Sequence, residues 1–258
     1  MEIMQLILVA VAGLAVGSFL NVVIYRLPRK IGLVMARSVC PGCSAQLKWY
    51  HNIPLLSYLF LRGKCAFCSK RISIQYPLVE ALNTILYLFF FWQFGISPGF
   101  FVLCVLGSAL IVVFFIDLEF MIIPDSITLP GMIVGLGVSL LPDGMGIVDS
   151  LIGLLTGGGS LYLVAILGDW LFKKESMGGG DIKLSAMLGA FLGWQKVLLI
   201  FISSAFIGLI ISLAVMVVSS KLRETRTIPF GPFLALAAVL SICCGEQIIN
   251  YYVTNFLG

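Results

Sequence analysis

The chain has 258 residues, of which 60% are hydrophobic and only 11% are charged, and its mean hydropathy is +1.10. A soluble domain carries about 25% charged residues, so these values exclude an ordinary soluble domain and favour a bundle of membrane helices. The formal net charge of +4 does not indicate a nucleic-acid partner, because most of the chain is lipid-soluble. We therefore expect an all-α polytopic membrane protein.

Eight apolar stretches are candidate membrane-spanning helices, since a span needs about 20 predominantly apolar residues. The first follows no basic segment and has no clear cleavage site, so we expect a retained helix rather than a signal peptide. The fourth and sixth stretches are short. The predicted spans lie near 3–25, 76–94, 99–116, 126–141, 149–171, 182–195, 197–219 and 229–249.

Positive charge predicts the orientation, because cytoplasmic loops collect Lys and Arg. The segment from Arg26 to Arg71 has nine Lys and Arg residues and no acid. With eight crossings and the N-terminus outside, the basic loops face the cytoplasm and only Lys196 falls at an outer turn. The other loop cations are Lys173, Lys174, Lys221, Arg223 and Arg226. Omitting span 182–195 would place the last three outside, so we keep it.

Four cysteines in the basic segment form two Cys-x-x-Cys pairs, Cys40 with Cys43 and Cys65 with Cys68. The gap of 21 residues slightly exceeds the roughly 15–20 residues usual for a zinc site of this pattern. Four thiolates complete a tetrahedron, so a bound zinc would be structural. Free thiols and a redox switch are the alternatives. Because metal binding supplies folding free energy, we expect a small cytoplasmic zinc-binding loop domain. Its basic residues are expected to meet anionic lipid headgroups.

Two aspartates, Asp117 and Asp181, fall at the ends of predicted spans, where ionisable residues are functional candidates. The topology places both at the cytoplasmic boundary, although they are 64 residues apart. Two close carboxyl groups share a proton. One can then activate water for attack on a peptide carbonyl, while the other hydrogen-bonds the carbonyl oxygen and helps the amine to leave. Such a pair titrates as a unit, so acid and base are not assigned.

The glycines before the second aspartate are expected to support it. Gly178 and Gly180 have no side chains, so a substrate strand could lie beside Asp181. The competing interpretation is a flexible turn with Asp181 as a helix N-cap.

Three charged residues are weaker candidates for a supporting role. Asp125 follows a proline and could simply start a helix. Glu80 could stabilise a helix N-terminus or line the active cavity. Lys183 could pair with an acid, although snorkelling is the simpler account. Glu119, two residues from Asp117, is a further competing acid.

The order of these motifs resembles the type IV prepilin peptidase family over nearly the whole chain. The resemblance implies an aspartic endopeptidase of the bacterial inner membrane that cleaves the leader of type IV prepilins or type II secretion pseudopilins at the cytoplasmic face. Asp117 and Asp181 match its catalytic pair. It also implies N-methylation of the new N-terminus with S-adenosylmethionine, which no motif here predicts independently. The matching segments are 17–28, the cysteine pairs, 52–57, 76–80, 117–125, 178–181 and 229–232.

Two other classes of membrane protein share some of these features. An intramembrane protease of the presenilin or signal-peptide-peptidase kind would share the Gly-x-Gly-Asp motif but would not need the cysteines. An ion or metal transporter would use the aspartates as cation sites, but transporters often contain internal repeats, and we find none. The expected organisation is a first helix at 1–25, a tetracysteine domain at 26–75 and a membrane-embedded protease domain at 76–258, with the oligomeric state open.

Overall fold

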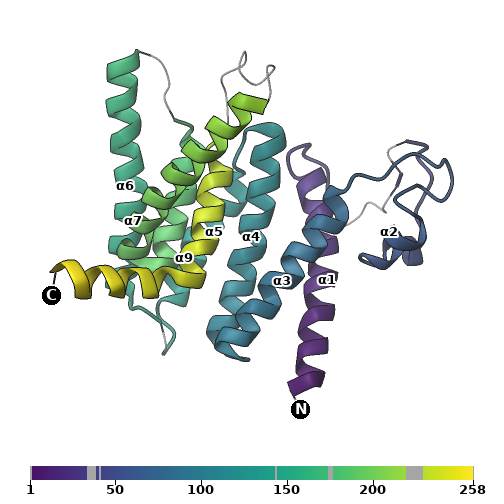
Figure 1. Ribbon diagram of the computed structural model, residues 1–258, viewed down its shortest axis with the longest axis horizontal. Helices are drawn as coiled ribbons and strands as arrows, with labels where there is room; N and C mark the ends of the chain where they lie inside the picture. Colours follow the sequence, from purple (N-terminus) through teal and green to yellow (C-terminus); the bar gives the residue numbers. More distant parts are fainter. Residues whose placement is uncertain are drawn as a thin grey trace. The chain divides into compact units, whose positions relative to one another are not determined.

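The computed structural model of the protein describes residues 2–33, 39–40, 42–142, 144–173, 177–218 and 229–257. These residues form helices and two isolated β-bridges, with no strand among them (Figure 1). This confirms the predicted all-α class. The chain divides into two compact units, residues 1–112 and 113–258.

Except for the short α2, the described helices are mainly apolar, and a helix satisfies its backbone hydrogen bonds internally, as a lipid environment requires. Six are long and apolar enough to cross a membrane, and α5 is a shorter apolar helix. The bounds are α1 Glu2–Arg26, α2 Leu56–Phe60, α3 Gln75–Phe94, α4 Pro98–Phe120, α5 Asp125–Val138, α6 Ile147–Phe172, α7 Gly179–Val218 and α9 Gly231–Tyr252. The predicted loop cations Lys174, Lys221, Arg223 and Arg226 lie outside the described residues.

Helix α7 contains a break at Gly193, whose φ of 80° and ψ of 169° are not helical. Lys196, just after the break, lies 2.9 Å from Glu246 near the end of α9, whereas Gly208 packs on Phe233 near its start. Since α9 and α7 begin at the same end of this unit, the chain turns back at the break. The predicted spans 182–195 and 197–219 therefore form one 40-residue element with an internal reversal.

This break accounts for the difference between eight predicted spans and six long helices. When α7 is counted as two segments and the short α5 is added, the described residues contain eight apolar helical segments. The reversal occurs at Gly193 and not between 195 and 197 because only a glycine tolerates a φ of 80° without strain.

Glycines bring α6 and α7 to backbone contact. A Cβ on Gly157 would collide with the Ser185 carbonyl, and one on Gly153 with the Gly189 carbonyl. The Ser185 hydroxyl donates to the Gly157 carbonyl at 3.0 Å. Small residues and hydrogen bonds of this kind hold membrane helices together, because lipid supplies no hydrophobic drive. The contact fixes the start of α7 against α6.

We expect Gly157→Ala to destabilise the protein and the neighbouring Gly159→Ala to leave its stability nearly unchanged. The new methyl group at 157 meets rigid backbone, whereas nothing lies within 4 Å of a Cβ at 159. Overpacking of this kind costs about 1–3 kcal/mol. Thermal unfolding in detergent measures the difference, and an equal loss in both variants would contradict the packing.

In the first unit α1 packs on α3 through Gly13 and Gly17. A Cβ on either would lie 2.8 or 2.7 Å from the Cα of Thr84 or Glu80. Asn83 locks the pair, because its Nδ2 donates to the Gly13 carbonyl at 2.8 Å. The cysteine-bearing segment leaves this helix pair at one end, between the end of α1 and the start of α3.

Candidate active site and metal centre

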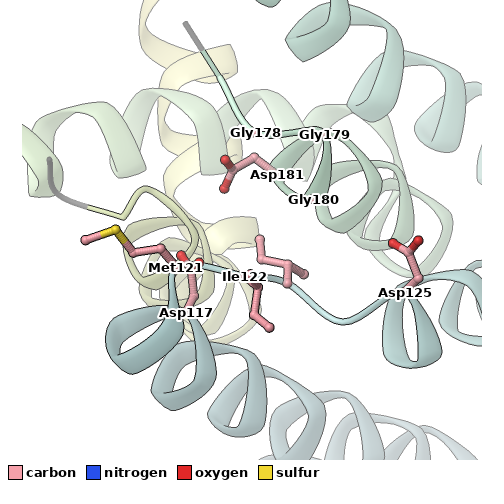
Figure 2. Close-up of a pocket in the computed structure, with 9 residues that line it drawn as sticks. Asp117, Met121, Ile122, Asp125, Gly178, Gly179, Gly180 and Asp181 are labelled. Atoms are coloured by element: carbon pink, nitrogen blue, oxygen red, sulfur yellow. The ribbon is translucent and has the colours of Figure 1, made fainter. Parts of the chain in front are cut away.

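The end of α4 and the start of α7 meet at a pocket of about 260 Å³ in the second unit. One wall is the segment between α4 and α5, and the other is the glycine run that opens α7. Figure 2 shows the carboxyl groups of Asp117 and Asp181 on facing walls, with Asp125 set apart from them. The lining residues are Asp117, Met121, Ile122, Ile123, Asp125, Gly178, Gly179, Gly180 and Asp181.

Both facing carboxyl groups are buried, with Asp117 5% and Asp181 9% exposed. The two carboxyl groups are close enough for a charge on Asp117 to act on Asp181. Oδ1 of Asp181 has no hydrogen-bond partner among the described residues. Leaving a buried carboxyl oxygen unpaired costs free energy, and such an oxygen is available to a water molecule or a polar substrate group. The pocket therefore has two carboxyl groups that can exchange protons with a bound ligand.

Asp117 faces the start of α9. A Cβ on Gly231 would fall 2.5 Å from Oδ2 of Asp117, and the Gly231 N–H interacts with this carboxyl group. The first N–H groups of a helix have no partner within it and favour an anion. Sequence reasoning did not assign a role to Gly231; its only signal was the segment 229–232 in the family resemblance.

Two of the three glycines in this run lie close to other residues of the pocket. A Cβ on Gly180 would lie 2.9 Å from that of Ile123 on the opposite wall, and one on Gly178 would lie 3.3 Å from Oδ2 of Asp181. Gly179 has nothing within 4 Å. Asp181 lies in the first turn of α7, two residues past its start, and not at the N-cap position of the competing interpretation.

The other candidate acids are placed differently. Lys183 Nζ lies 2.8 Å from both carboxylate oxygens of Asp125, so this lysine pairs with an acid. Glu119 is exposed and does not line the pocket. Glu80 belongs to the first unit, where its Oε2 accepts a hydrogen bond from the Leu55 N–H at 2.8 Å.

The two cysteine pairs in the first unit adopt the same turn. In each, the N–H of the first cysteine donates to the carbonyl five residues later at 2.9 Å, and the serine after the second cysteine has a φ of 57°. An antiparallel β-bridge closes each turn. The residues are Cys40, Ala45 and Ser44 in one turn and Cys65, Lys70 and Ser69 in the other. The two Cys-x-x-Cys turns therefore have the same backbone geometry.

The four thiols converge on one point. All four Sγ atoms lie within 4.8 Å of one another, and the Sγ atoms of Cys40 and Cys68 are 3.9 Å apart. A tetrahedral zinc–thiolate centre with bonds of about 2.3 Å has sulfur–sulfur edges of about 3.8 Å. Backbone N–H groups of Gly42 and Cys43 lower the pKa of the Cys40 thiol to about 6, whereas the pKa of the neighbouring Cys43 thiol is raised to about 11, so Cys40 is the thiol of this pair that ionises first. The cluster therefore fits a tetrahedral metal ion.

The fold and these two sites define a multi-pass membrane protein with a buried aspartate pair and a separate four-cysteine metal centre. Sequence models of known families match two parts of the chain: the bacterial peptidase A24 N-terminal domain matches residues 11–94, and the type IV leader peptidase family matches residues 104–213. The first match contains all four cysteines, and the second contains both aspartates. The chain belongs to the type IV leader peptidase family.

Relatives that carry the name prepilin leader peptidase/N-methyltransferase match along most of their length. The chain is 36% identical to the one from Aeromonas hydrophila over 278 residues, which cover 97% of this chain and 94% of the relative. It is 37% identical to that of Legionella pneumophila over 279 residues, with coverages of 96% and 94%. The Myxococcus xanthus relative is 42% identical over 230 residues, with coverages of 86% and 67%. No solved structure matches the chain.

Proposed function

We propose that this protein is a membrane aspartic endopeptidase that removes the leader from type IV prepilins or pseudopilins and then N-methylates the new N-terminus. The observation that carries the proposal is the buried pair Asp117 and Asp181, which line one pocket in a chain of the type IV leader peptidase family. The named relatives have both activities in their names. Nothing in these comparisons favours an ion or metal transporter.

In the proposed reaction the two carboxyl groups share one proton, because two buried carboxylates side by side do not both ionise easily. The ionised group takes a proton from water as the water oxygen attacks the scissile carbonyl carbon. The protonated group hydrogen-bonds the carbonyl oxygen, and a tetrahedral intermediate forms. Its collapse breaks the C–N bond, and the leaving amine takes a proton from the pair. Gly231 orients Asp117, and Oδ1 of Asp181 is the free acceptor.

The neighbouring residues support this pair. We propose that Gly178 and Gly180 let the two walls approach closely, since side chains there would meet Asp181 and Ile123. The ion pair of Asp125 and Lys183 connects the first residue of α5 to the fifth residue of α7 and so supports the position of one pocket wall against the other.

Different observations support the two proposed cofactors. Cys40, Cys43, Cys65 and Cys68 would hold a structural zinc, since their thiol geometry fits a tetrahedral ion and leaves no open position for catalysis. We propose that segment 26–75 folds around it. S-adenosylmethionine would donate the methyl group, as the N-methyltransferase names of the relatives suggest. No side chain among the described residues is assigned to that donor.

We propose an inner-membrane location with the N-terminus outside and both the cysteine segment and the pocket facing the cytoplasm. Lys173 follows the end of α6, and Lys183 contacts Asp125 of the pocket lining, as the positive-inside rule expects. Lys196 of α7 lies beside the second half of α9, where its Nζ forms an ion pair with Oε1 of Glu246 at 2.9 Å. A charge at the outer turn is therefore compensated.

The test is cleavage of a purified prepilin by the purified protein reconstituted in lipid. We expect a shortened product with the mature N-terminus, and an added methyl group when S-adenosylmethionine is present, both read by mass spectrometry. A precursor that stays intact with folded protein would contradict the peptidase. Metal uptake by the same vesicles without cleavage would support the transporter instead.

A further inference from the structure

Helix α2 begins beside one end of α3, a helix that is long and apolar enough to cross a membrane. Helix α3 has 20 residues, which span about 30 Å at 1.5 Å per residue, the thickness of the hydrocarbon core. Glu80 is five residues past the start of α3 and thus about 7.5 Å along its axis. Because Glu80 accepts the Leu55 N–H at 2.8 Å, the chain enters α2 beside the second turn of α3.

The apolar side chains of α2 have no cover in the described part of the first unit. Phe60 is 83% exposed, Leu59 69% and Leu56 52%, and no residue of this helix is buried. A contiguous exposed apolar patch marks a surface that contacts another molecule or a membrane. Because α2 begins beside the end of a helix that is long enough to cross a membrane, the nearest apolar phase available to it is the acyl-chain region of the lipid.

Three cationic side chains follow the apolar residues of α2, next to the second cysteine pair. Arg62, Lys64 and Arg71 are exposed, and the β-bridge between 64 and 71 brings the last two side by side. The hydrogen bond from the Ile72 N–H to the Gly63 carbonyl, 2.8 Å long, joins this turn to the end of α2. With no acid between residues 26 and 71, the surface is complementary to anionic phospholipid headgroups.

We propose that α2 is an interfacial anchor that binds a leaflet containing anionic phospholipid. Leu56, Leu59 and Phe60 enter the boundary between headgroups and acyl chains, while Arg62, Lys64 and Arg71 bind headgroup phosphates. The anchor holds the four-cysteine centre, which continues directly from this turn at Cys65, on the membrane surface. It does not depend on peptidase activity.

The test places the photo-crosslinking residue p-benzoylphenylalanine at position 60 of the full-length protein. Nanodiscs contain either a phosphatidylglycerol–phosphatidylcholine mixture or phosphatidylcholine alone, and mass spectrometry quantifies lipid adducts after irradiation. We expect a several-fold higher adduct yield with phosphatidylglycerol. The triple variant Arg62→Gln, Lys64→Gln, Arg71→Gln should lower it to the level of the neutral disc, with unchanged thermal unfolding.

A matched control is the same crosslinker at position 92, because Trp92 is 82% exposed near the other end of α3. Its lipid adduct should be independent of headgroup charge and of the triple variant. Three results would overturn the anchor: no lipid adduct at position 60, equal yields in the two discs, or an adduct with a second copy of the chain or with added prepilin in place of lipid. Cleavage measured on the same samples separates this outcome from a failure of the proposed peptidase.

Discussion

We expect Asp117→Asn and Asp181→Asn each to lower kcat/KM for leader cleavage by about 10³-fold or more, because general acid–base groups contribute about 10²–10⁴-fold and both carboxyl groups act in the same step. Asparagine keeps the shape of the side chain but neither gains nor loses a proton at neutral pH. Both sites are buried, so a side chain of similar volume preserves packing. Cleavage of purified prepilin in lipid by each variant measures the loss, and circular dichroism checks the fold.

Asp125→Asn is the matched control for this pair. Asp125 lines the same pocket, but its carboxylate is about half-exposed and paired with Lys183. An exposed ion pair contributes about 0.2–1 kcal/mol, which corresponds to a loss of no more than about fivefold. If a folded Asp117→Asn or Asp181→Asn variant still cleaved normally, that residue would leave the pair, and Asp125 and Glu119 would become the next candidates.

Replacing all four cysteines of the metal centre by serine should unfold the segment around it and leave the bond-breaking step largely intact. Among the residues from 39 to 74 whose burial the structure describes, only Cys40 and Cys65 are buried, so these residues have no core apart from the cysteine cluster. Metal binding supplies about 10–16 kcal/mol of folding free energy in zinc-finger peptides. Elemental analysis should show loss of bound zinc, and hydrogen exchange should show loss of protection over the cysteine turns.

Cys244→Ser provides the control, because Cys244 is an exposed thiol in α9 and not part of the cluster. Its zinc content and exchange pattern should equal those of the unmodified protein. Unchanged loop protection after the fourfold replacement would refute the structural role of the metal. A loss of cleavage as large as that of the aspartate variants would show that the centre takes part in catalysis itself.

Local sequence was sufficient for the all-helical class and for the position of the two aspartates near helix ends, and it predicted the clustering of the four cysteines. The length of an apolar run sets a membrane helix, and the spacing of Cys40, Cys43, Cys65 and Cys68 predicts a tetrahedral site. Both properties depend on residues close together in the chain, so a pattern can reveal them. The position of the two aspartates at helix ends followed from the same runs.

Contacts between distant segments required the tertiary structure. The sequence ranked Asp125 and Glu119 below Asp117 and Asp181, but only the packing shows their contacts: Asp125 pairs with Lys183, and Glu119 does not line the pocket. The approach of Gly231 to Asp117 is equally invisible in a local pattern. Such contacts depend on how helices cross, and backbone contact between α6 and α7 at glycines sets where Asp181 lies. Helix packing therefore decides which acids face each other, while local sequence decides only their depth.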